Sequence, residues 1–135
     1  MKDLSYQQKI AMMRILLDII HADGRIDARE TFYFNKMKED LGLNNDDRKV
    51  VEEKNSLLAL SQLRCFDEEQ KEYFAKVMGR MIIVDEDVNV NEVNIYNIVC
   101  DFCGIEVMFE DFISETEINN LTYSDAEYKQ GSDIR

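Results

Sequence analysis

Two short stretches of the chain carry carboxylates at a spacing that could bind a cation. HADGRIDARE spans residues 21–30 and IVDEDVNVNE spans residues 83–92, and the two share one layout at a fixed offset of 62 residues. The matching acids are Asp23, Glu30, Asp85 and Glu92. Carboxylates that converge are the ligands that hard divalent cations prefer. The sequence therefore predicts a candidate site for Ca²⁺, Mg²⁺, Mn²⁺ or Zn²⁺, which Asp27, Asp87 and His21 could complete.

The same residues also fit a simpler interpretation, a turn followed by a helix cap. Gly24 would adopt the positive φ that ends one helix, and Asp27 would cap the next helix, with Glu30 reaching back to it as a capping box. Asn89 and Glu92 would form another capping box in the second stretch. A free-standing EF-hand loop is disfavoured, because its first two ligand positions would be Ile19 and His21, which offer no carboxylate. The capping turn gives every residue of the stretch a structural role, and the residues alone leave open whether a shared cation site is present as well.

Apolar residues recur at helical spacing along most of the chain, which has no proline and five glycines. This pattern predicts an all-α fold. The first long helix is apolar on most of its sides, so we expect it to lie at the centre of a bundle. We expect helices near residues 5–22, 28–41, 46–63 with a break, 68–84, 90–103 and 106–112, and no sheet.

The fixed offset also predicts how the helices are organised. A long helix, an acidic turn, a capped second helix and a closing glycine occur twice in the same order, with Gly42 and Gly104 as the two closing glycines. We therefore predict a compact helical bundle built from two duplicated helix-turn-helix hairpins. Residues 1–113 would form this domain. Residues 114–135 lose the apolar periodicity and are predicted to be a polar tail, irregular or partly disordered.

Composition limits the classes of partner. The chain has 135 residues and a formal net charge of −12, which argues against nucleic acid and favours cations or a basic protein surface. Arg14 and Asp18 interrupt the apolar run near the N-terminus, so we expect neither a secretory segment nor a membrane span, and we expect a cytoplasmic protein. The residues predict no oligomeric state.

Three cysteines and one histidine give little basis for redox or zinc chemistry. Cys100 and Cys103 form a C-x-x-C pattern, but they precede Gly104 at a predicted helix C-terminus, where the helix dipole opposes thiolate formation. We expect both to be buried and unreactive. Cys65 and His21 do not add a second ligand pair at the spacing of a zinc finger.

The acidic turns and their surroundings resemble the TerB-like domain family, which includes tellurite-resistance TerB proteins and the N-terminal domain of the DjlA co-chaperone. The resemblance covers about residues 8–112: a long apolar helix ends in ADG, a glutamate follows six residues after the glycine, a helix closes on LGL, and VDEDVNVNE with CGI forms a second round. It implies an all-helical bundle without established catalysis and a role in metal-linked stress response or as an adaptor near membrane-associated complexes. The family's acidic positions carry over to Asp23, Glu30, Asp85 and Glu92.

The chain departs from the family pattern in two places. Glu86 stands where glycine is usual in the second turn, and no His-Pro-Asp signature follows, so a co-chaperone activity of its own is excluded. The favoured hypothesis is a non-enzymatic binding or adaptor module with a protein partner. One alternative is a carboxylate-metal enzyme of the helix-bundle type, which needs more histidines than His21 alone. Another is a purely structural or oligomerisation domain.

Overall fold

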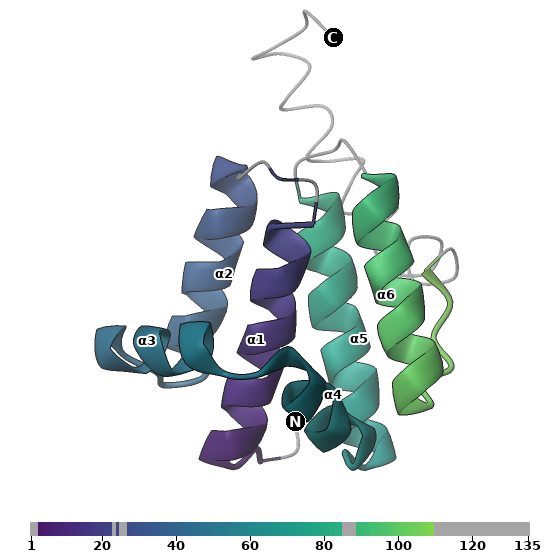
Figure 1. Ribbon diagram of the computed structural model, residues 1–135, viewed down its shortest axis with the longest axis horizontal. Helices are drawn as coiled ribbons and strands as arrows, with labels where there is room; N and C mark the ends of the chain where they lie inside the picture. The colour runs from purple at the N-terminus through teal and green to yellow at the C-terminus, as the bar shows by residue number, and fades with distance from the viewer. Residues whose placement is uncertain (1–2, 23, 25–26, 85–88, 110–135) are drawn as a thin grey trace, which may run out of the picture.

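The computed structural model describes residues 3–22, 24, 27–84 and 89–109. Within these ranges the chain forms six α-helices and no strand, which confirms the all-α prediction (Figure 1). The helices are α1 (Tyr6–Ile20), α2 (Ala28–Asp40), α3 (Asn45–Glu53), α4 (Ser56–Arg64), α5 (Glu68–Ile83) and α6 (Val90–Cys103). The predicted break near Asn55 is the N-cap of α4.

None of these helices is long and apolar enough to cross a membrane. The predicted tail, residues 114–135, lies outside the described residues.

Helix α1 is the central element of the bundle. It contacts each of the other five described helices, and nine of its fifteen residues are buried. Figure 1 shows α1 and α5 side by side, with α2 beyond α1 and α6 beyond α5, while α3 and α4 cross in front of the lower half of these helices. A helix that is apolar on most of its surface can bury that surface only by being enclosed, which is why the first helix takes the central place.

Side-chain caps set where the helices begin. Ser5 with Gln8 in α1 and Asp67 with Gln70 in α5 form complete capping boxes, in which the cap oxygen accepts from the N3 amide and the glutamine oxygen accepts from the cap amide. Asn44 does the same for α3. Each cap satisfies amides that have no partner inside the helix.

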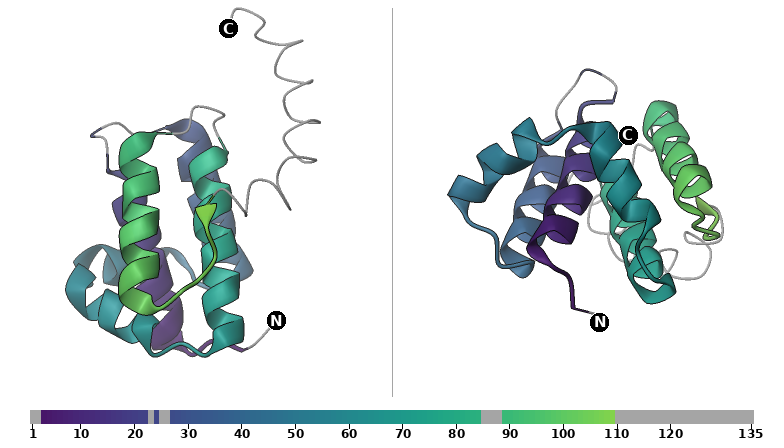
Figure 2. Two further views of the ribbon diagram at one scale, coloured as in Figure 1. Left: turned by 90° about the vertical axis from the view of Figure 1, so that its right-hand side faces the viewer. Right: turned by 60° about the horizontal axis from the view of Figure 1, so that its bottom comes forward.

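The predicted helix over residues 106–112 is wrong for residues 106–108, which are not helical. Gly104 ends α6 with φ of 74°, and the segment after it runs back alongside α6, as the left view of Figure 2 shows. From Ile105 to Phe109, buried or half-buried residues alternate with exposed ones, and the Val107 carbonyl accepts a 2.7 Å hydrogen bond from the Tyr96 hydroxyl. Alternation with a period of two is typical of an extended chain. The hydrogen bond from Tyr96 holds this segment against α6. Residues 110–112 lie outside the described part.

Candidate functional site

The helix ends that flank the two acidic turns all lie at the same end of the bundle. Figure 1 shows the C-terminal ends of α1 and α5 and the N-terminal ends of α2 and α6 at the top of the molecule. Two glutamates stand in the first turns there, Glu30 in α2 and Glu92 in α6. Helices α2 and α6 both pack against α1 and α5, so the two glutamates approach the same central pair of helices from its two flanks.

Both glutamates are almost completely buried, with exposed fractions of 1% for Glu30 and 2% for Glu92. A fully buried glutamate is rare, because an ionised carboxylate loses strong interactions with water. The N-terminal end of a helix compensates for part of this loss, because its dipole and its open amides favour negative charge. The same compensated burial therefore occurs in both predicted hairpins.

The helix caps beside these glutamates agree only in part with the predicted capping boxes. Asp27 accepts from the amides of Arg29 and Glu30, and Asn89 accepts from the amides of Asn91 and Glu92, so both residues are N-caps as predicted. The reciprocal bond from the third residue back to the cap amide, seen in α1, α3 and α5, does not occur among the described contacts of α2 and α6. A glutamate that reached back to the cap would lie at the exposed start of the helix, whereas both side chains are buried.

The remaining residues of the predicted cation site are only partly placed. Asp23, Asp85 and Asp87 lie outside the described residues. His21 is exposed at the C-cap of α1, and the Asp27 carboxylate also lies 3.6 Å from the Arg29 guanidinium. Among the residues that the structure describes, no three histidine, cysteine or acidic side chains gather closely enough to hold a metal ion. Convergence of the four carboxylates thus stays a prediction.

The cysteines of the C-x-x-C pattern are buried, as predicted, and form no disulfide. Burial raises the pKa of the Cys100 thiol to about 12, although a hydrogen bond with Tyr96 opposes the shift. Burial also raises the pKa of Cys103, whose sulfur lies 3.7 Å from the Leu60 carbonyl oxygen. Desolvation is therefore the main cause of the raised pKa values, and the helix dipole proposed from the sequence is not needed. Cys65 is exposed and free.

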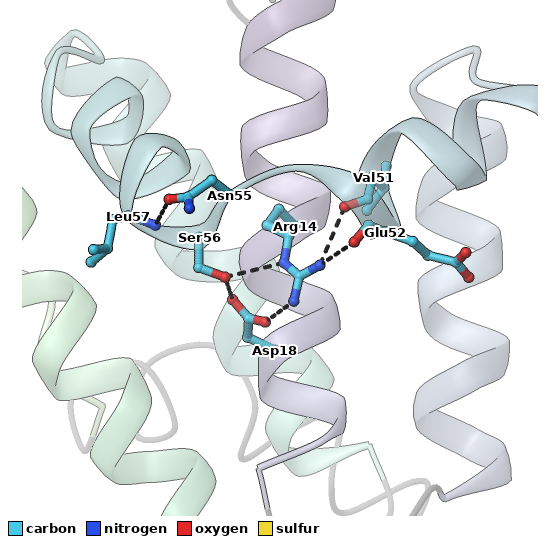
Figure 3. Close-up of polar contacts among 7 residues, drawn as sticks. All are labelled: Arg14, Asp18, Val51, Glu52, Asn55, Ser56 and Leu57. Atoms are coloured by element: carbon cyan, nitrogen blue, oxygen red, sulfur yellow. Dashed lines mark hydrogen bonds and ion pairs between the residues drawn. The ribbon is translucent and has the colours of Figure 1, made fainter.

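One polar cluster was not anticipated from the sequence (Figure 3). The Arg14 guanidinium pairs with Asp18 at 2.6 Å and donates to the Ser56 hydroxyl at 3.2 Å, and Ser56 in turn donates to Asp18 at 2.7 Å. Arg14 also donates to the carbonyls of Val51 and Glu52. The cluster joins α1 to the α3–α4 junction.

Two open clefts lie on the described part of the surface. One, of about 410 Å³, lies where the first turn of α5 meets the segment after Gly104, and its polar walls are Glu68, Glu69, Lys71, Glu72 and Glu106. The other, of about 630 Å³, lies at the junction of α2 and α3 and is lined largely by asparagines with Lys38, Glu39 and Arg48. Neither cleft is lined by histidine, cysteine or serine.

Comparison with known proteins supports the fold alone. The chain is similar to the crystal structure of a protein of unknown function from Porphyromonas gingivalis W83, with a TM-score of 0.67 and 22% sequence identity. The match covers 82% of this chain and 95% of that chain. No family model and no curated protein match the sequence.

Proposed function

We propose that this protein is a non-enzymatic binding module of the TerB-like type, which binds a divalent cation at its acidic turns and engages a protein partner. The observation that carries the proposal is the burial of Glu30 and Glu92 at matching positions, at one end of the bundle and directly beside those turns. Burial of an ionised carboxylate raises its free energy, and a cation nearby lowers it again. The carboxylates of Asp23 and Asp85 would complete the ligand set.

The TerB-like duplication draws support from how closely the two halves agree. Helices α1 and α5 begin at residues 6 and 68, and α2 and α6 begin at residues 28 and 90, which is the same offset of 62 in both cases. Gly42 and Gly104, at that offset, both adopt positive φ, 77° and 74°. Phe34 and Tyr96, at the same offset, are both fully buried. A role in stress response or tellurite resistance follows from the family resemblance alone and is proposed on that basis.

A binding role is favoured over the carboxylate-metal enzyme by the position of the only histidine in the sequence. Di-metal sites in helix bundles use histidines that project into the bundle together with carboxylates. His21 instead lies exposed at the end of α1. Because His21 is exposed, the buried candidate ligands at this end of the bundle are the two glutamates. A site made of carboxylates suits calcium or magnesium better than redox metals.

Titration of the full chain with Ca²⁺, Mg²⁺, Mn²⁺ and Zn²⁺, by calorimetry and by thermal melting, tests the proposal. At least one ion should release or absorb heat on binding and raise the melting temperature. An ion present at one hundred times its Kd stabilises the folded state by about 2.7 kcal/mol, which corresponds to a shift of several degrees. Glu30→Gln and Glu92→Gln should weaken this response, and Asp23→Asn combined with Asp85→Asn should abolish it.

Glu53→Gln is the matched control, because it removes an exposed carboxylate of α3 away from the turns. It should leave both the heat and the thermal shift unchanged. If none of the four ions gives heat or a shift, the cation site is excluded and the acidic turns serve only as capping turns. If Glu53→Gln lowers the response as much as the turn variants do, the ions bind the acidic surface diffusely rather than at a site.

A further inference from the structure

A neutral apolar strip lies between α4 and α6 on this otherwise acidic protein. We define the α4–α6 strip by three side chains, Leu57, Ile98 and Phe102, whose exposed fractions are 73%, 60% and 45%. Helices α4 and α6 contact each other, and the Arg64 guanidinium lies over the Phe102 ring, 5.3 Å from its centroid. Leu57 lies two turns before Arg64 on the same side of α4, and Ile98 lies one turn before Phe102 on α6, so the three apolar side chains lie on the helix faces that the Arg64–Phe102 contact joins.

The strip differs in charge from the rest of the molecule. The chain has 28 acidic residues, yet α4 has none, and α6 has only the buried Glu92 and the exposed Asp101. At the C-terminal end of α6 two cations are close by: Arg64 covers Phe102, and a Cβ added at Gly104 would lie 3.6 Å from the Lys71 ammonium. The strip is therefore apolar along its length and positive at one end, and it fits a segment with apolar anchors and negative charge.

The chain itself contains a segment of this kind beyond the described residues. Residues 110–135 include seven large apolar side chains, and their seven acids against two bases give a net charge of −5. The apolar residues are Phe112, Ile113, Ile118, Leu121, Tyr123, Tyr128 and Ile134. The segment starts beside α6, because Phe109 packs edge-on against Tyr96 with ring centroids 5.4 Å apart. Its 26 residues can reach about 85 Å when extended, whereas α6 is about 21 Å long.

We propose that residues 110–135 dock on the α4–α6 strip of the same chain, with apolar side chains over Leu57 and Ile98 and carboxylates toward Arg64 and Lys71. The segment is favoured over a second copy of the chain as the occupant of the strip, because it is covalently attached. Covalent attachment holds the segment at an effective concentration in the millimolar range, about a thousand times that of a second copy in a micromolar solution. A second copy would also bring another net charge of −12 against the first. This inference does not depend on cation binding.

Cys65 provides a reporter for the test, because it follows Arg64 and is exposed, whereas Cys100 and Cys103 are buried. A chain ending at Phe109 keeps the six described helices and every buried core residue that the structure describes, so it is expected to fold. A fluorophore on Cys65 of this shortened chain should change its emission when a synthetic peptide of residues 110–135 is added, and the change should saturate. The saturated signal should equal that of the labelled full chain.

Leu57→Ser combined with Ile98→Ser should raise the Kd of the peptide about tenfold or more, because two apolar contacts are lost. Both positions are exposed, so the fold does not need these side chains. Phe32→Ser is the matched control, since Phe32 is equally exposed, at 72%, but lies on α2. It should leave peptide affinity unchanged. Absence of a saturable change, or equal affinity for the strip variant, overturns the proposal. Concentration-dependent dimerisation of the full chain that the strip variant abolishes would also overturn it and assign the strip to a second copy.

Discussion

The guanidinium of Arg14 and the hydroxyl of Ser56, which are 42 residues apart in the sequence, lie 3.2 Å apart in the fold. The same guanidinium reaches the carbonyls of Val51 and Glu52 in the last turn of α3, at 3.4 and 2.8 Å. Carbonyls of a last turn have no partner within their helix, and a positive group there also favours the helix dipole. One arginine on the central helix thus joins the last turn of α3 to the first residue of α4.

Arg14→Met should lower the free energy of unfolding by about 1–3 kcal/mol, because it leaves the partly buried Asp18 without its ion pair and removes the Arg14 hydrogen bonds to the carbonyls of Val51 and Glu52. Urea denaturation of both proteins measures the difference. Glu52→Gln serves as the control, since it removes an exposed ion pair with Arg48 and should change stability by no more than about 0.5 kcal/mol. Equal losses for the two variants would show that the Arg14 cluster adds nothing beyond surface charge.

The cysteines should react very unequally with a thiol reagent in the native state. Cys65 is exposed, whereas burial raises the pKa of Cys100 to about 12 and also raises that of Cys103. At pH 8 only about one Cys100 thiol in ten thousand would be ionised at that pKa. We expect one rapid equivalent of labelling per native chain and three in denaturant, counted by mass spectrometry. Rapid native labelling at Cys100 or Cys103 would show that the end of α6 opens readily.

Acid titration should reveal the contact between Tyr6 and Asp47. The amide of Asn44 and then the Tyr6 hydroxyl, which donates at 2.7 Å, hold the pKa of Asp47 below its ordinary value of 3.8. Because the pKa is lowered in the folded state, the contact stabilises the protein above about pH 3.8 and is lost as the pH falls through the folded value. Tyr6→Phe should raise the pKa of Asp47 only part of the way, measured by NMR of its carboxyl carbon. An unchanged pKa would mean that the hydroxyl does not bind this carboxylate in solution.

The two glycines that end α2 and α6 should respond alike to substitution. Gly42 and Gly104 have φ of 77° and 74°, and a Cβ at either position meets nothing closer than 3.6 Å. The cost of Gly42→Ala or Gly104→Ala is therefore conformational, about 1–2 kcal/mol in thermal or urea unfolding. Asparagine at the same positions should cost less, because it tolerates the left-handed conformation better than alanine. Alanine variants as stable as the wild type would contradict the left-handed turns.

A substitution of Asp27, the N-cap of α2, tests whether this residue is a helix cap or a metal ligand. Asp27 accepts from the amides of Arg29 and Glu30, so Asp27→Ala should lower the free energy of unfolding by about 1 kcal/mol. The Asp27 carboxylate already accepts the helix amides and lies beside the Arg29 guanidinium. We therefore expect divalent ions to raise the melting temperature of Asp27→Ala by as much as that of the wild type. Loss of that shift in Asp27→Ala would identify Asp27 as a metal ligand.

Local signals in the sequence predicted the helices well and the segment after Gly104 poorly. Caps such as Asp27 and Asn89 act within three residues of themselves, so their identity alone places a helix start. The segment from Ile105 to Phe109 has too few residues for its alternating pattern to be distinguished from a helical one. Its extended path depends on the Tyr96 hydroxyl, whose position is known only once α6 is packed.

What the sequence determined by itself is the set of interactions between near neighbours: the all-α class, the helix starts at their caps, the turns at Gly42 and Gly104, and the central place of an all-round apolar α1. Tertiary structure alone decided that Glu30 and Glu92 are buried rather than closing capping boxes, and that Arg14 meets Ser56. The physical reason is the separation along the sequence over which each kind of interaction acts. A cap or a glycine turn is complete within a few residues, whereas desolvation and long-range hydrogen bonds depend on which helices enclose a side chain, and local periodicity does not encode that.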